Sequence, residues 1–181
     1  MIKKHYKETQ GEGLVDPVPS LEIKDWRRKM LKGIPYQISP ELLKVLDEMG
    51  HTDELVIADG NFPGSTMGTR VIRADGMGVP ELLDAILQLF PLDTYPNSKG
   101  EEDPPCTLMA LEPGDVGKVA TPIWDEYKAI VAKYDERGEK AFKEINKWKF
   151  YDQTREKAKV VVQTTETAIY ANIILRKGVV I

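Results

Sequence analysis

The fold is decided by residues 49–63, which read MGHTDELVIADGNFP. A glycine suited to ending a helix is followed by a short polar turn and by the apolar run 55–58, which is too short for a helix. We interpret this run as a strand buried on both faces, with a loop after it. His51 then precedes the strand and Asp59 follows it directly, so each end of the strand carries a side chain capable of proton transfer.

A helix is predicted over residues 39–49, immediately before this unit. Ser39 suits the N-cap and Pro40 the first helical position, and apolar residues recur at helical spacing after them. The next predicted elements are a strand over 69–76, a helix over 79–90 and a strand over 107–111. They are followed by a helical region over 123–150, broken at 137–138, with its second helix over 140–148. Helix over 153–157, a strand over 160–164 and one or two strands over 170–181 complete the pattern.

This alternation of strands and helices predicts a single-domain α/β sandwich. In such a sheet, ligands collect at the carboxyl ends of the strands. His51 and Asp59 would lie at opposite strand ends, unless a second subunit or a loop brings them together. A simpler interpretation stays open for both, because a histidine after a helix end is often a capping or surface residue and an aspartate after a strand is often a turn residue.

The composition excludes several classes of protein. The chain has 181 residues, a net charge of −4 and a pI of about 5.4, with no basic stripe of the kind that binds nucleic acid. A single cysteine, Cys106, excludes an intrachain disulfide and a cysteine-based structural zinc site, and it fits a reducing compartment. Neither a signal peptide nor a membrane-spanning run is visible, so we expect no membrane partner and a cytoplasmic location.

Several short motifs, in order along the chain, make the sequence resemble a known family. They are MLKGIP (30–35), MGHTDE (49–54), ADGNFP (58–63), IRADG (72–76), FPLDTY (90–95), TTET (164–167) and YANIIL (170–175). Together they resemble the RbsD/FucU family of D-ribose pyranases and L-fucose mutarotases, closer to the fucose branch. The resemblance covers residues 30–181, predicts an RbsD-like fold, and leaves residues 1–29 as an N-terminal extension.

The resemblance implies mutarotation, which is the interconversion of the α and β anomers of a pyranose, without a cofactor or metal, and the expected sugar is L-fucose. Opening a hemiacetal ring requires a proton on the ring oxygen and removal of one from the anomeric hydroxyl, and an imidazole can do either near neutral pH. The site residues expected are the catalytic His51 and Tyr151 and the sugar-binding Asp59, Asp75, Tyr170 and Asn172. Tyr151 could equally be a core residue and Asp75 a turn residue.

The chain departs from the family pattern at two places, and both bear on sugar preference. Thr165 stands where the family usually has glycine. A basic residue expected about one turn before residues 150–151 has no clear counterpart, because Trp148 lies near that place between Lys147 and Lys149.

The resemblance also implies homo-oligomeric rings, often decamers, with the active site at a subunit interface. Three other functions stay open. One is D-ribose pyranase activity, and another is a non-catalytic monosaccharide-binding accessory of a sugar transport or catabolic system. The third is isomerisation or epimerisation of another sugar. Aldose–ketose isomerases frequently need a divalent metal, and the sequence shows no cluster of histidine and carboxylate residues at ligand spacing.

Overall fold

The computed structural model describes residues 31–67 and 70–180, so the predicted extension 1–29 lies outside the described residues. Within the described residues, six strands form one sheet in the order β2-β5-β1-β6-β3-β4. Five of the strands are parallel and β6 runs antiparallel to both of its neighbours. The strands are β1 (Glu54–Ala58), β2 (Arg70–Ala74), β3 (Cys106–Met109), β4 (Phe142–Ile145), β5 (Ala158–Thr164) and β6 (Ile173–Arg176).

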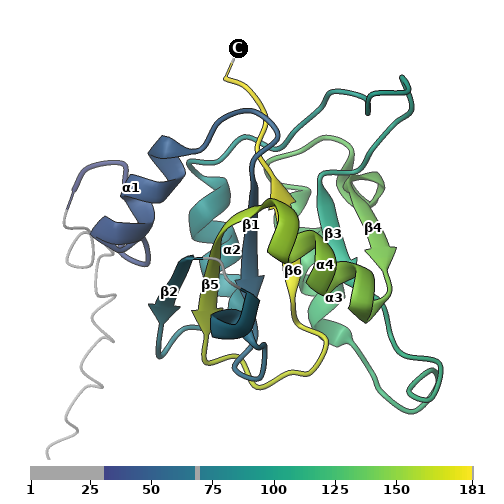
Figure 1. Cartoon of the computed structure of the whole chain (residues 1–181). Helices are drawn as coiled ribbons and strands as arrows, with labels where there is room; N and C mark the ends of the chain where they lie inside the picture. The colour runs from purple at the N-terminus through teal and green to yellow at the C-terminus, as the bar shows by residue number, and fades with distance from the viewer. Residues whose placement is uncertain (1–30, 68–69, 181) are drawn as a thin grey trace, which may run out of the picture.

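Helices cover both faces of this sheet, as Figure 1 shows. One face packs against α1 (Pro40–Glu48), α2 (Val79–Leu87) and α3 (Pro122–Val131), which share the larger hydrophobic cluster. The other face packs against α4 (Lys147–Lys157) and the short 3-10 helix η2 (Gly64–Met67) in a smaller cluster. A second 3-10 helix, η3 (Gly138–Ala141), leads into β4. This arrangement confirms the predicted α/β sandwich.

Strand β1 is buried along its whole length, as its apolar sequence predicts. Leu55 and Ile57 belong to the larger cluster, whereas Val56 and Ala58 belong to the smaller one. The alternation follows from the pleat of a strand, which points successive side chains to opposite faces. On this strand, polar side chains that could contact a ligand can therefore lie only at its two ends.

The prediction of a helix over residues 140–148 is wrong. Residues 142–145 form β4, which pairs in parallel with β3 from Cys106↔Phe142 to Met109↔Ile145. Lysine and glutamate favour a helix here, but pairing with the open edge of β3 prevails over this weak local preference. The helix begins only at α4, where the side chain of Asn146 accepts a hydrogen bond from the backbone N–H of Lys149 at 3.0 Å.

The C-terminal strand region is shorter than predicted. Strand β6 covers only Ile173–Arg176, because Tyr170 adopts a left-handed backbone conformation with φ of 60° and turns the chain before the strand.

Among the described residues, none of the helices has the length and apolar character needed to cross a bilayer.

The close approach of Gly178 to a neighbouring chain segment gives the first prediction. A Cβ added at Gly178 would lie 2.5 Å from the carbonyl oxygen of Leu92, which is backbone and cannot rotate away. We expect Gly178→Ala to lower the free energy of unfolding by about 2 kcal/mol through overpacking. The matched control is Gly114→Ala, where nothing lies within 4 Å of the added Cβ and the change should stay within about 1 kcal/mol. Urea denaturation of both variants measures the difference, and equal stabilities would contradict the prediction.

Candidate active site

A cavity of about 170 Å³ opens at the carboxyl ends of β1 and β3, where β6 begins. Its volume is below the roughly 300–1,000 Å³ of pockets that enclose a drug-sized ligand, so it suits a small polar molecule. Its walls mix polar and apolar side chains from both halves of the chain. The lining residues are Asp59, Asn61, Phe62, Met109, Lys147, Tyr151, Ile169, Tyr170 and Asn172.

A buried carboxylate and amide form the floor of this cavity. Asn172 Nδ2 donates to Asp59 Oδ2 at 2.8 Å, and the backbone N–H of Asp59 donates to Asn172 Oδ1 at 2.9 Å. The backbone N–H of Asn61 donates to Asp59 Oδ1 at 2.9 Å, and Gln163 Nε2 donates to the Asp59 carbonyl at 2.5 Å. These four bonds hold Asp59 in one orientation at the cavity lining.

The protonation of Asp59 reflects its burial. Only 4% of Asp59 is exposed, and this burial raises the pKa of its carboxyl above the usual value. Hydrogen bonds from the Asn61 backbone and from Asn172 act in the opposite direction, because they favour the ionised form, and they offset only part of the rise.

Tyr151 brings a phenol to the cavity from α4. Its ring packs edge-on against Phe62, with centroids 5.6 Å apart. Burial, followed by the charge of Asp59, raises the pKa of the Tyr151 hydroxyl, so this group keeps its proton at neutral pH. Within the described part of the chain, the Tyr151 hydroxyl makes no hydrogen bond and is free to donate to a ligand.

Tyr170 is placed differently, because its hydroxyl is already engaged. That hydroxyl donates to Asp115 Oδ2 at 2.5 Å and accepts from the backbone N–H of Glu112 at 3.2 Å. Trp124 Nε1 donates to the Tyr170 carbonyl at 2.8 Å, which fixes the left-handed residue. The bond to Asp115 comes first among the causes that raise the pKa of Tyr170. Tyr170 therefore shapes the cavity wall, and its phenol proton is not available to a ligand.

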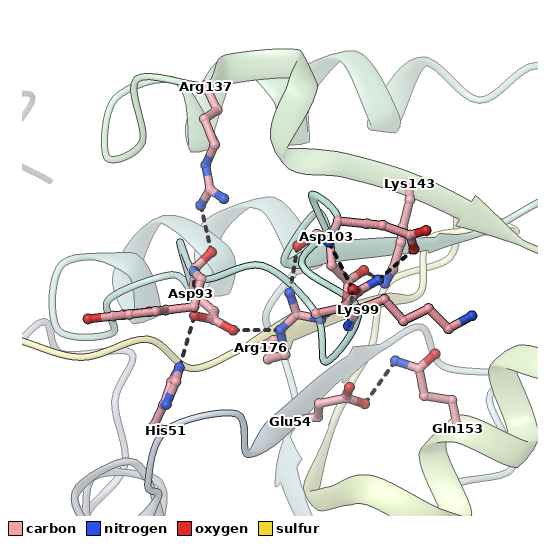
Figure 2. A network of polar contacts seen from close by, with 12 residues as sticks. His51, Glu54, Asp93, Lys99, Asp103, Arg137, Lys143, Gln153 and Arg176 are labelled. Carbon is pink, nitrogen blue, oxygen red and sulfur yellow. Dashed lines mark hydrogen bonds and ion pairs between the residues drawn. The ribbon is translucent and has the colours of Figure 1, made fainter.

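His51 lies at the opposite end of β1, just before the strand begins, within a network of charged residues shown in Figure 2. His51 Nε2 lies 3.1 Å from Asp93 Oδ1, and the ring packs edge-on against Tyr95 with centroids 5.1 Å apart. Arg176 Nε donates to Asp93 Oδ2 at 2.9 Å, and Arg137 Nη2 donates to the Asp93 carbonyl at 2.8 Å. Asp93 is thus a fixed acceptor for the imidazole.

The ionisation of Asp93 determines the tautomer of His51. Burial alone would raise the pKa of Asp93, but hydrogen bonds from the Tyr95 backbone, His51 and Arg176 lower it overall. An ionised carboxylate only accepts hydrogen bonds, so Nε2 of His51 must carry the hydrogen. Nδ1, which has no hydrogen bond within the described residues, is the nitrogen left for proton transfer.

Within one chain, His51 and Asp59 are separated by the whole of β1. A five-residue strand spans about 16 Å, so one monosaccharide cannot touch both side chains. This separation agrees with the sequence analysis, which places the two residues at opposite strand ends.

Two other residues singled out from the sequence lie outside the cavity lining. Asp75 is exposed at the end of the edge strand β2 and pairs with Arg73, whose Nη2 lies 2.5 Å from Asp75 Oδ1. Thr165 does not have the positive φ that would require glycine. Its hydroxyl accepts a hydrogen bond from the Gly76 backbone at 3.0 Å and lies 3.4 Å from the Met77 carbonyl, so the threonine joins its own turn to the turn after β2.

Lys147 is one of the two basic residues that flank Trp148 in the sequence. It lines the cavity, and its Nζ lies 3.9 Å from Glu112 Oε1 across the opening. Lys147 and Tyr151 are four residues apart on α4 and so share one face of the helix, a spacing that would have revealed the lysine had the helix been placed correctly. Met109 and Ile169 carry no motif signal.

The family described as "RbsD / FucU transport protein family" has a model that matches residues 32–180, which is most of the chain. The chain belongs to this family. Fucose mutarotase from Homo sapiens is 47% identical to this chain over 153 residues, which cover 82% of this chain and 94% of that relative.

Two solved structures are similar in both sequence and fold. FucU from Bifidobacterium longum is 52% identical with a TM-score of 0.76, and it covers 83% of this chain and 100% of its own. The fucose mutarotase of Streptococcus pneumoniae in complex with L-fucose is 42% identical with a TM-score of 0.73 and has the same coverage. The resemblance to the fucose branch of the RbsD/FucU family is therefore confirmed.

Within the described residues, no group of three or more histidine, cysteine or acidic side chains has an arrangement that could hold a metal ion.

The hydrogen bonds of the two buried carboxylates give a prediction for their pKa values. Asn172→Ala should raise the pKa of Asp59, because it removes a donor that favours the ionised form. The control is Gln153→Ala, which removes the matching 2.9 Å donor to Glu54 and should raise the pKa of Glu54 alone. Carbon-13 NMR titration of the side-chain carboxyls measures both values. An unchanged or lowered Asp59 pKa in Asn172→Ala would show that the hydrogen bond does not govern its ionisation.

Proposed function

We propose that this chain interconverts the α and β anomers of L-fucose. The observation that carries the proposal is the cavity with its oriented Asp59–Asn172 pair and free Tyr151 hydroxyl, found in a chain 42% identical to a fucose mutarotase solved with L-fucose. The buried pair offers acceptors and donors at fixed positions, which suits recognition of neighbouring sugar hydroxyls.

The chemistry requires only proton transfer. Ring opening places a proton on the ring oxygen while the anomeric hydroxyl loses one, and closure on the other face of the carbonyl gives the second anomer. We assign the general acid and base to Nδ1 of His51, oriented by Asp93, and to the Tyr151 hydroxyl. Asp59 and Asn172 hold the sugar. The Tyr170 hydroxyl supports the wall, and Asp75 contacts sugar only if a second subunit extends the site.

The two halves of the site come together in a homo-oligomer. His51 of the partner subunit completes the cavity that Asp59 and Tyr151 form in the first subunit. The distance along β1 supports this arrangement, because no single chain can present both groups to one sugar. A closed ring, such as the decamer expected from the family resemblance, would repeat one such interface around its axis.

Anomer exchange measured by saturation-transfer NMR tests the activity. The wild-type chain should accelerate exchange of L-fucose, and His51→Ala should reduce the acceleration by about 10²–10⁴-fold, the usual contribution of a positioned acid or base. Tyr151→Phe keeps the aromatic ring but removes the proton, and we expect a loss within the same range.

Tyr134→Phe is the matched control, because it removes a hydroxyl that bonds Asp84 away from the cavity and should leave exchange unchanged. Acceleration of anomer exchange for D-ribose alone would show that the substrate is D-ribose and would leave the proposed proton-transfer mechanism intact. Binding of L-fucose without acceleration would favour a non-catalytic accessory protein.

Mixed oligomers test whether the site spans two subunits. His51→Ala and Tyr151→Phe chains, each inactive alone, should recover activity when they are unfolded and refolded together. Random assembly gives about one quarter of the sites an intact His51 from one subunit and an intact Tyr151 from the other. Recovery near this fraction of wild-type activity supports a shared site, whereas no recovery would place the whole site within one chain.

A further inference from the structure

A row of three aromatic rings runs from the core to the rim of the cavity. The first ring is Phe62, which is only 6% exposed, and the second is Tyr151, which packs edge-on against it at an interplanar angle of 71°. The third is Trp148, whose ring meets Tyr151 at 6.1 Å and 87°. Phe62 and Tyr151 line the cavity, and Trp148 lies beside the lining because it packs against Tyr151.

Trp148 is unusual in its exposure. It is 64% exposed, although tryptophan is the largest apolar side chain and is highly buried on average. Lys147 Nζ lies over the Trp148 ring at 5.0 Å from its centroid, which orients the indole through a cation–π contact. The same lysine lines the cavity, so one residue links the position of the indole to the binding site.

We propose that Trp148 is a platform on which the sugar bound in the cavity stacks its apolar C–H face, and that Trp148 thereby determines which sugars bind. The inference rests on the proposed function, since the occupant is the monosaccharide of that site. A pyranose has hydroxyls at its edge and C–H groups on its faces. The Asp59–Asn172 pair and Lys147 suit the hydroxyls, and an exposed ring beside them suits a C–H face.

The combination of groups favours a sugar over an apolar partner on this wall. The row begins inside the cavity, and its first two rings stand beside the buried carboxylate and amide. Trp148 is also held by a lysine, whose charge would have to lose its water beneath a purely apolar surface. A ligand with both polar and apolar edges satisfies the lysine, the amide and the indole together.

The experiment measures binding of L-fucose by calorimetry to the intact chain, and anomer exchange by NMR in parallel. Trp148→Ala should weaken binding about 3- to 10-fold, the range expected for one aromatic stacking contact, and raise KM with little change in kcat. Trp148→Phe keeps a ring and should bind within about twofold of the wild type. Tyr134→Ala removes another exposed aromatic ring outside the cavity lining and should bind as the wild type does.

Light scattering on the same variants separates the sugar platform from a subunit contact. Weaker binding with unchanged molar mass supports the platform. Unchanged binding in Trp148→Ala overturns it, and so does a loss of binding accompanied by a fall in molar mass. Exchange activity in the wild type together with unchanged binding in Trp148→Ala would leave the proposed function intact. A wild-type chain that binds no L-fucose overturns both.

Discussion

The complete burial of β1 is the constraint on which the rest of the structure depends. Helices cover both faces of the sheet, so residues 55–58 of β1 are apolar and the strand offers polar groups only where it begins and ends. The two ends differ in their surroundings. Asp59 at the carboxyl end is held by an amide and backbone N–H groups, and its pKa is raised by burial. Asp93, beside His51 at the other end, is held by Arg176 and has a lowered pKa.

These opposite pKa shifts distinguish the two ends of β1. The low pKa of Asp93 keeps a negative charge beside the imidazole and determines which nitrogen carries its hydrogen. The raised pKa of Asp59 reflects its burial, because a charged carboxylate is disfavoured away from water. The two carboxyl groups therefore lie in opposite electrostatic surroundings, and β1 keeps them apart within one chain.

Much of this could be predicted from sequence, because the informative signals are local. The apolar run 55–58 defines β1, and the motifs on both sides of it identify the RbsD/FucU family. The signals fail where distant residues decide the outcome. Residues 142–145 become a strand because the edge of β3 is open, which no local pattern reveals. The place of Lys147 in the cavity lining was not predicted for the same reason, since its position on α4 depends on where β4 ends. The engagement of the Tyr170 hydroxyl with Asp115, 55 residues earlier, is likewise invisible in a linear pattern.

The sheet order has a consequence for how the chain folds. Strand β6 is the last strand of the described chain, yet it lies between β1 and β3 and joins the two halves of the sheet. The sheet cannot close before the residues of β6 have left the ribosome, so the edges of β1 and β3 that pair with β6 stay unpaired until then. Such non-local pairing slows folding and exposes strand edges to aggregation. A nascent chain of this fold depends on β6, and termination before this strand would leave two half-sheets without the strand that joins them.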